Sequence, residues 1–342
     1  MMRSNDITFA KKEPSLFVLQ SPFQILCAAA AIKYFEITEY EILLVLPIGE
    51  VRNQQSINMM EKLDLHYKIV SGSRVGNRNR LTLPFTIEGK YRRAFLGYYA
   101  FEDGYYHCIK QLRRGGSLVL LDDGIATITL VLKGFTPHGR ERYVYGYYYW
   151  LMRIRGISAH NLFTVYKGLE NPIWHIEIND LSLVNKKKDA GSIQGVYFVG
   201  TNSSSYSSLS LKHGEEEYKE MIYASLKDIR AKYPDEVIIY IPHGRDKAEY
   251  TISYCEEYGI RYQKVSTSIE MFMLEQLHRP KAIYGYTSSA LFNLKKLFPE
   301  TEVINILPEG NDGRINERFK EISDYYETQG IITHIYKKQN SQ

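Results

Sequence analysis

The chain has 342 residues, of which 44% are hydrophobic and 24% are charged. This length exceeds what one hydrophobic core usually organises, and this composition is close to the average of globular proteins, so two folded domains are expected and wholesale disorder is excluded. The 43 Lys and Arg against 39 Asp and Glu leave a net charge of only +4, far from the one-sided charge of a dedicated nucleic-acid binder. No nucleic-acid partner is therefore expected, and an anionic ligand must be bound by residues gathered at one site.

The cysteine pattern and the absence of long apolar runs indicate a cytoplasmic protein. Cys27, Cys108 and Cys255 are odd in number and widely spaced, which supports neither a disulfide framework nor a thiolate zinc site. The N-terminal segment has no apolar core like that of a signal peptide, and no window of about 18 apolar residues occurs along the chain. We therefore expect free thiols and no membrane span.

The first half of the chain alternates apolar runs with segments of helical periodicity. The predicted elements are a strand over 15–19, a helix over 23–34, a strand over 41–46, a helix over 53–63, a strand over 66–70, a Gly, Ser and Arg-rich loop over 71–80, a helix over 95–112 and a strand over 117–121. Between Gly134 and Gly168 the pattern gives way to an aromatic and basic stretch around Tyr147-Tyr148-Tyr149-Trp150.

A charged segment of small residues over 186–192 is the best linker candidate, and alternation resumes after it. The second half is predicted to contain strands over 195–199, 237–241, 281–285 and 303–306, and helices over 218–233, 248–258, 269–277, 290–297 and 314–329. The sequence thus predicts one domain over 1–188 and a second over 189–342, whose last helix has the option of packing back on the first.

Two consecutive runs of strand and helix predict two parallel-sheet domains with a cleft between them. In such sheets ligands bind outside the carboxyl ends of the strands. Polar clusters stand at four of these predicted ends. They are Gln20-Ser21-Pro22-Phe23-Gln24, Asp122-Asp123-Gly124, Pro242-His243-Gly244 and Thr287-Ser288-Ser289.

Each cluster has a chemical and a purely structural interpretation. Asp122 or Asp123 offers a carboxylate for general base catalysis, or is a solvated acid in a turn. His243 is a proton donor projecting from a tight turn, or an ordinary core or surface residue. Ser288 or Ser289 caps a helix whose free N–H groups bind phosphate, or is a cap and nothing more.

Other motifs narrow the choice of ligand. The hydroxyl-rich loop after the strand over 195–199 contains Asn202 and offers groups for sugar or phosphate oxygens, or is simply flexible. Neither a P-loop nor a G-x-G-x-x-G fingerprint is present, which disfavours mononucleotide and dinucleotide sites of those kinds. No D-x-D motif and no histidine pair with metal-ligand spacing occurs, so no metal is expected.

The order of these motifs resembles that of bacterial sialyltransferases of the two-domain GT-B type. Those enzymes share an acidic pair followed by Gly, a later His-Pro motif and a Ser-Ser or Ser-Thr motif, which Asp122-Asp123-Gly124, His243 and Ser288-Ser289 match. The opening 21–26 segment also resembles the first strand-turn-helix of lipooligosaccharide sialyltransferases, grouped as glycosyltransferase family 52, and of polysialyltransferase-like proteins. The matches span residues 15–306, and Gly244 stands where the family usually has Pro.

The resemblance implies an α/β fold of GT-B type, with two Rossmann-like parallel-sheet domains facing a central cleft. It implies inverting transfer of sialic acid or a related nonulosonic acid from its CMP derivative, without a cofactor or a required metal. Asp122 would be the base, Asp123 the supporting acid, and His243 the group that protonates or hydrogen-bonds the departing phosphate. The residues expected around the donor are Ser288, Ser289, Thr287, Gly244, Pro242, Ser21, Gln24 and Asn202.

The implied partners are a nucleotide-sugar donor and an oligosaccharide or glycolipid acceptor on a glycan such as lipooligosaccharide or capsule. The aromatic and basic stretch from Arg140 to Arg155 suits either sugar stacking and peripheral contact with the inner membrane, or a helical core between the domains. Two alternatives stay open. The chain is a GT-B glycosyltransferase with another nucleotide sugar, or a non-catalytic protein of glycan assembly.

Overall fold

The computed structural model describes residues 14–47, 52–75, 78–81, 90–98, 102–134, 139–169, 171–181, 194–202, 214–244, 246, 249–276, 278–309 and 315–337. The chain divides into two compact units, Met1–Val184 and Asn185–Gln342. The predicted linker over 186–192 lies outside the described residues.

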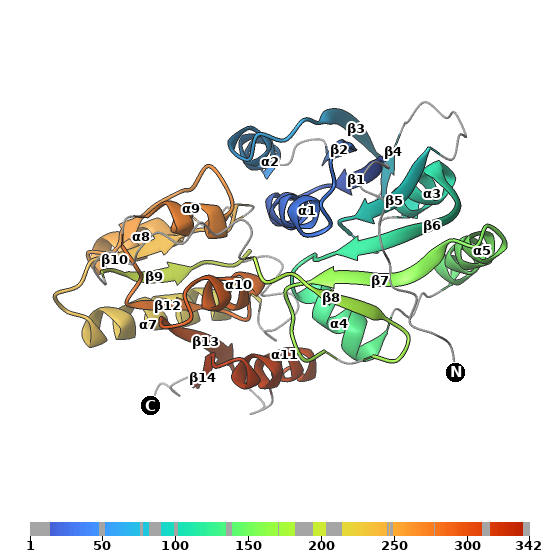
Figure 1. The fold of residues 1–342 in the computed structure, drawn as a ribbon. Coiled ribbons are helices and arrows are strands. Elements are labelled where there is room, and N and C mark those ends of the chain that lie inside the picture. Colours follow the sequence, from blue (N-terminus) through green and yellow to red (C-terminus); the bar gives the residue numbers. More distant parts are fainter. Residues whose placement is uncertain are drawn as a thin grey trace. The chain divides into compact units, whose positions relative to one another are not determined.

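The first unit is built on one sheet with the strand order β4-β3-β2-β1-β5-β6-β7-β8 (Figure 1). Its neighbouring strands are parallel except for the antiparallel pair of β3 and β4. The strands are β1 (Ser15–Leu19), β2 (Tyr40–Pro47), β3 (Lys68–Val75), β4 (Arg78–Leu81), β5 (Tyr91–Leu96), β6 (Leu112–Leu121), β7 (Ser158–Thr164) and β8 (His175–Ile178). The helices are α1 (Pro22–Tyr34), α2 (Arg52–Lys62), α3 (Glu102–Gln111), α4 (Ile125–Lys133) and α5 (Arg140–Ile154).

The centre of this sheet is apolar because strands in a parallel sheet are covered on both faces. All five residues of β1 are buried, and the ring of Phe17 stacks on that of Phe95 in β5 at 4.4 Å between centroids. Helix α1 is apolar almost all round and is correspondingly buried. It begins where Ser21 caps it and Pro22 fixes the first helical position.

The second unit contains a parallel sheet with the order β11-β10-β9-β12-β13-β14. Its strands are β9 (Val196–Val199), β10 (Ile238–Ile241), β11 (Arg261–Tyr262), β12 (Ala282–Gly285), β13 (Glu302–Pro308) and β14 (Ile332–Tyr336). Its helices are α7 (Glu215–Lys232), α8 (Tyr250–Glu257), α9 (Ile269–Glu275), α10 (Ser289–Leu297) and α11 (Glu317–Thr328). The last of these packs on β13 and β14 of the same unit.

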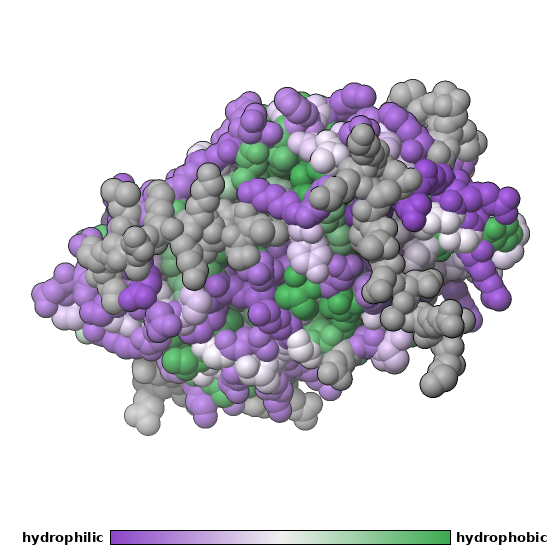
Figure 2. Space-filling view, viewed as in Figure 1, coloured by the Kyte–Doolittle hydropathy of each residue, from purple (hydrophilic) through white to green (hydrophobic). Residues whose placement is uncertain are grey.

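Tyrosine supplies much of the core of the second unit. The chain has 29 tyrosines, and Tyr197, Tyr218, Tyr240, Tyr286 and Tyr326 are among its largest fully buried side chains. The Tyr286 hydroxyl donates to Ser225 Oγ at 3.0 Å. A large part of the tyrosine excess is therefore structural. On the face drawn in Figure 2, the surface is mostly hydrophilic with apolar side chains in small groups.

Two predictions about the first unit were wrong. The stretch over 71–80 is not a loop throughout, because β3 continues to Val75 and β4 begins at Arg78. The predicted helix over 95–112 begins only at Glu102, and Phe95 belongs to β5. In the stretch after Gly134, where the sequence pattern predicts no element, the structure contains the helix α5 and the strand β7.

Candidate functional site

The two acids that follow β6 occupy different environments. Asp122 is fully buried. Its Oδ1 accepts a hydrogen bond from the Thr164 hydroxyl at 2.6 Å, and its Oδ2 accepts one from the Val165 N–H at 2.7 Å. Both carboxylate oxygens therefore join the end of β6 to the end of β7, which is a structural task.

Asp123 is only partly buried and is held from the opposite side. Its Oδ1 accepts a hydrogen bond from Gln24 Nε2 at 2.7 Å, and its backbone N–H donates to Thr127 Oγ1 at 3.0 Å. Of the two acids, Asp123 is the one with exposed surface to offer a substrate. A hydrogen bond to a charged oxygen is among the stronger ones in proteins, so Gln24 fixes the orientation of this carboxylate.

The Gln24 side chain reaches Asp123 because the chain leaves room at Gly97. Gln24 is buried, and its Oε1 accepts a hydrogen bond from the Gln20 N–H at 2.7 Å. A Cβ at Gly97, directly after β5, would lie 2.2 Å from that Oε1. The predicted residue Ser21 caps α1 by accepting from the Gln24 N–H at 3.4 Å. Gln24 thus holds the Asp123 carboxylate, and Ser21 caps the helix that carries Gln24.

The second unit carries its polar residues around the point where its strand order reverses. The chain proceeds from β9 to β10 on one side and later returns to β12 on the other side of β9. Ligands bind at such a switch point, outside the carboxyl ends of the strands. Asn202 follows β9, His243 follows β10 and Thr287 follows β12, so three predicted residues stand at adjacent strand ends.

The turn after β10 has the tight form that the sequence predicts. The His243 carbonyl accepts a hydrogen bond from the Asp246 N–H at 2.8 Å, which closes a four-residue turn. Pro242 is buried, whereas His243 and Gly244 are partly exposed. His243 therefore keeps some exposed surface at the end of its strand.

The turn after β12 is strained and rigidly held. Thr287 has φ of 25°, an uncommon value for a residue other than Gly, and its N–H donates to Asn305 Oδ1 at 2.7 Å. Asn305 is fully buried in β13, and its Nδ2 donates to the Ser323 hydroxyl at 2.8 Å. Sequence reasoning missed Asn305. Its only sequence signal is an amide inside an otherwise apolar strand.

The start of α10 combines a helix N-terminus with a hydroxyl that lacks a partner. Of the two predicted N-cap candidates, Ser288 is the N-cap and accepts from the Ala290 N–H at 3.3 Å, while Ser289 is the first helical residue. Thr287 is 3% exposed, and its Oγ1 has no hydrogen-bond partner among the described residues. A buried hydroxyl without a partner costs about 1–3 kcal/mol. A bound anion at the helix start would satisfy it.

Two glycines let the backbone pack closely around the switch point. A Cβ at Gly200, after β9, would lie 2.5 Å from the Tyr240 hydroxyl oxygen. A Cβ at Gly285, the last residue of β12, would lie 2.8 Å from the Val199 carbonyl oxygen. Both positions therefore require Gly. The remainder of the predicted hydroxyl-rich loop, Ser203 onward, lies outside the described residues.

Comparison with known proteins places the fold. No family model and no curated protein sequence matches the chain. A crystal structure of a putative UDP-N-acetylglucosamine 2-epimerase from Listeria monocytogenes matches with a TM-score of 0.55 at 11% identity, over 93% of this chain and 89% of that one. An α/β-galactoside α-2,3-sialyltransferase from the marine bacterium Photobacterium phosphoreum matches with a TM-score of 0.53 at 12% identity, over 95% and 99%.

A third structure, S. aureus MnaA with UDP, matches with a TM-score of 0.52 at 9% identity, over 86% of this chain and 79% of that one. The chain has a GT-B-like fold. The predicted fold class, two Rossmann-like parallel-sheet units, is thereby confirmed. At these identities the likeness concerns the fold alone, and the donor, the reaction and the acceptor remain predictions.

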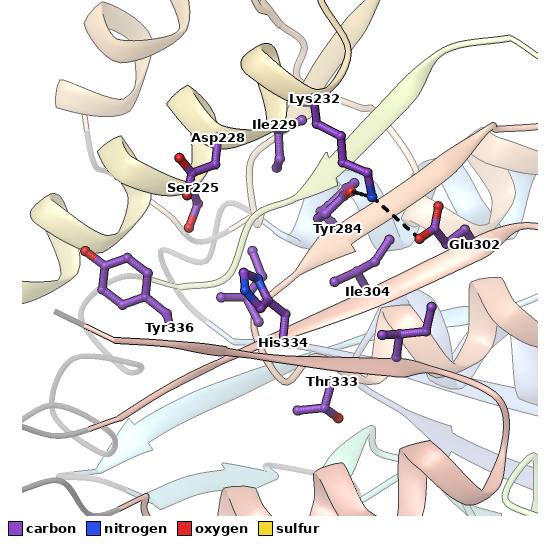
Figure 3. Close-up of a pocket in the computed structure, with 12 residues that line it drawn as sticks. Ser225, Asp228, Ile229, Lys232, Tyr284, Glu302, Ile304, Thr333, His334 and Tyr336 are labelled. Carbon is purple, nitrogen blue, oxygen red and sulfur yellow. Dashed lines mark hydrogen bonds and ion pairs between the residues drawn. The ribbon is translucent and has the colours of Figure 1, made fainter. Parts of the chain in front are cut away.

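The second unit also contains a pocket of about 320 Å³ between α7 and the strands β12 to β14 (Figure 3). Lys232 Nζ donates to the Tyr284 hydroxyl at 3.0 Å and lies 3.6 Å from Glu302 Oε1. The hydrogen bond to Tyr284 raises the pKa of Lys232, so this amine stays charged. Glu302 is the first residue of β13, so the pocket reaches the amino-terminal ends of the strands, whereas His243 and Thr287 follow their carboxyl ends.

Two further findings concern metals and membranes. Within the described ranges, no group of three or more His, Cys, Asp and Glu side chains is arranged to hold a metal ion. Among the helices of the described part of the chain, none is long and apolar enough to cross a membrane.

Proposed function

We propose that the chain is an inverting glycosyltransferase that transfers sialic acid, or a related nonulosonic acid, from its CMP derivative to a hydroxyl of a cell-surface glycan such as lipooligosaccharide or capsule. The observation that carries the proposal is the cluster at the switch point of the second unit. The partly exposed His243, Asn202 and the start of α10 with the unpartnered Thr287 hydroxyl stand there at adjacent strand ends.

The start of α10 suits the phosphate of the donor. Backbone N–H groups of a first helical turn and the positive end of the helix dipole favour an anion, and the nine residues of α10 are enough to provide both. A phosphate oxygen would accept the hydrogen bond that Thr287 Oγ1 lacks. Ser288 and Ser289 add two more hydroxyls to the same turn.

Asp123 is the proposed general base, in place of Asp122. The acceptor hydroxyl gives its proton to the Asp123 carboxylate as its oxygen attacks the anomeric carbon of the donor sugar. Asp122 is fully buried and both of its oxygens already hold β7, so its proposed role is to fix the turn that carries Asp123.

His243 and the α10 start act on the leaving group. The bond between the anomeric carbon and the phosphate oxygen breaks as the new glycosidic bond forms, and its electron pair stays on CMP. His243 donates a proton or a hydrogen bond to that oxygen, which stabilises the charge that develops in the transition state. This assignment needs no metal, which stays a prediction.

Thr287→Val tests the phosphate site directly. Because the native hydroxyl is buried without a partner, its removal should raise the stability of the ligand-free protein by about 1 kcal/mol. The same change should weaken CMP binding about tenfold, since a hydrogen bond to phosphate is lost. Calorimetry with CMP and thermal unfolding provide the two readouts.

Thr301→Val is the matched control. Thr301 is equally buried in the same unit, but its hydroxyl donates to the Pro280 carbonyl oxygen at 3.0 Å. This variant should lose stability and keep its CMP affinity. If Thr287→Val binds CMP like the intact chain, the phosphate site is elsewhere. If UDP binds and CMP does not, the alternative with another nucleotide sugar replaces the proposal.

A further inference from the structure

Helix α5 of the first unit carries aromatic and apolar side chains on two opposite faces, of which only one is needed for folding. Tyr145, Tyr148 and Met152 form the inner face and are buried. The ring of Tyr105 in α3 lies 5.5 Å from that of Tyr145, edge to face, and 6.4 Å from that of Tyr148. This packing fixes α5 on the unit.

The outer face of α5 consists of Tyr143, Tyr147, Trp150 and Ile154. These side chains are 80%, 49%, 57% and 50% exposed. At 3.6 residues per turn they fall within an arc of about 60° on the side opposite to the inner face. A helix on a protein surface normally carries charged residues there. Exposed large apolar side chains gathered in one stripe indicate an interaction surface.

The composition of this outer face favours the interface of a lipid bilayer. Tyr and Trp are enriched there because their rings are apolar and their polar groups reach the headgroups. Tyr147 and Trp150 stack on each other with their ring centroids 5.9 Å apart, so the two exposed aromatic side chains form one group. In Figure 2, pale and green residues lie among purple ones where Figure 1 draws α5, at the right edge.

The charges beside the stripe favour an anionic surface. Arg142 and Arg153 are exposed, and their eleven-residue spacing places them along one edge of the outer face. Arg114, which precedes the Gly115 that is hydrogen-bonded to the C-terminal end of α5, is also exposed. Basic residues at a membrane surface each add about 1 kcal/mol of attraction to anionic lipid.

We propose that the outer face of α5 docks the protein on an anionic phospholipid bilayer, with the helix lying in the plane of the interface. Tyr143, Tyr147, Trp150 and Ile154 enter the headgroup region, and Arg142 and Arg153 pair with lipid phosphates. This inference does not depend on the donor or on the reaction proposed above.

Trp150 itself reports the contact. The chain has two tryptophans, Trp150 and Trp174, so Trp174→Phe leaves a single reporter on the outer face. Its fluorescence emission should shift to shorter wavelength when vesicles of phosphatidylcholine with phosphatidylglycerol are added, and lipids brominated on their acyl chains should quench it. Vesicles of phosphatidylcholine alone should give a much smaller response, and added salt should reverse the binding.

Flotation with the same vesicles separates the contribution of the basic residues from that of the aromatic residues. In the otherwise native chain, Arg142→Gln and Arg153→Gln should each lower the partition coefficient about fivefold, and Trp150→Ser should lower it about tenfold. Val237→Ser is the control, because Val237 is 62% exposed in the other unit and should leave partition unchanged.

Three results would overturn the proposal. One is an emission of Trp150 that does not change with anionic vesicles. Another is vesicle binding that survives all three substitutions on α5. The third is concentration-dependent self-association without lipid that Trp150→Ser abolishes, which would assign the outer face to a second copy of the chain. Transfer activity on a free oligosaccharide should be unaffected by these variants, so a failure of the proposed reaction is recognised separately.

Discussion

The contact between Gln24 and Asp123 can be broken by adding one methyl group at Gly97. A Cβ at that position would lie 2.2 Å from Gln24 Oε1 and 2.5 Å from Gln24 Cδ, both far inside van der Waals contact. Gln24 is buried, so a small shift within its present site cannot relieve the clash, and the side chain must take another conformation. Gly97→Ala therefore removes the hydrogen bond from Gln24 Nε2 to Asp123 Oδ1, which is 2.7 Å long.

The size of the effect follows from the kind of hydrogen bond that is lost. A hydrogen bond to a charged group contributes about 1.5–3 kcal/mol, which corresponds to a loss in kcat of about tenfold to hundredfold if Asp123 is the base. The KM for the donor should change little, because the proposed phosphate-binding residues Thr287, Ser288 and Ser289 belong to the second unit. Steady-state kinetics of CMP release with a saturating acceptor measure both quantities.

Gly146→Ala is the matched control for this substitution. Gly146 lies inside α5, and a Cβ there has no atom within 4 Å. Alanine in place of glycine in a helix should raise stability by about 1 kcal/mol and leave kcat unchanged. A folded Gly97→Ala protein with the native kcat would refute the reasoning, because it would show that the Gln24 contact does not support catalysis.

Three further predictions test other parts of the structure. Asn305→Ala should raise the KM for the donor about tenfold, because the Thr287 N–H loses its acceptor. Asn305→Asp keeps an acceptor oxygen and should recover most of the affinity. Equal kinetics for both variants and the intact chain would contradict this role of Asn305. Burial lowers the pKa of His107 to about 4, whereas in the unfolded chain the pKa is about 6.5, so at a pH between these values only the unfolded chain binds the proton. Between about pH 7 and pH 5 the unfolding free energy should therefore fall by about 2 kcal/mol more in the intact chain than in His107→Gln. Denaturant titrations in which the two proteins lose equal stability over this pH range would contradict the prediction. Cys27, Cys108 and Cys255 are all buried, so they should resist a disulfide reagent in the native state and react on unfolding. Burial raises the pKa of Cys255 to about 12 and that of Cys108 still further, which lowers the reactivity of these two thiols again. Rapid reaction of any of the three in the native state would contradict the prediction.

The second unit was the easier half to predict because its strands are short apolar runs followed by turn residues. Helix α10 follows from the sequence alone, which also limits its N-cap to Ser288 or Ser289. The first unit was harder to predict because some of its strands contain charged residues. β5 contains Arg93, which is buried, and its guanidinium lies 5.3 Å from the centroid of the Phe35 ring. A charged residue that is buried on an aromatic face breaks the apolar pattern from which a strand is recognised.

The candidate acids show where local reasoning stops. Asp122 and Asp123 are adjacent and chemically identical, and their different roles arise from partners that are remote in the chain. Thr164 arrives from β7 to engage Asp122, and Gln24 arrives from α1 to engage Asp123. A sequence can indicate that an acidic pair follows a strand, but only the fold shows which of the two carboxylates is buried and which keeps exposed surface.

The side chains of the aromatic stretch around α5 divide between a buried face and an exposed face. Tyr145 and Tyr148 are buried in the core of the first unit, whereas Tyr147 and Trp150 are exposed. The helical period of this stretch distributes the side chains between the two faces. Composition alone did not reveal which tyrosines are buried, since almost every residue in the run is aromatic.

The most direct test of the central claim is acceptor-dependent release of CMP from CMP-sialic acid by the intact chain, Asp123→Asn, His243→Asn and Asp122→Asn. We predict release by the intact chain with a lactose-type acceptor. Asp123→Asn should abolish transfer while still binding CMP, and His243→Asn should also abolish it. Asp122→Asn should mainly lose stability, by about 1–3 kcal/mol, because an amide N–H would face the Val165 N–H or replace the acceptor for Thr164. Full activity of Asp123→Asn, or no CMP release and no CMP binding by the intact chain, would contradict the account.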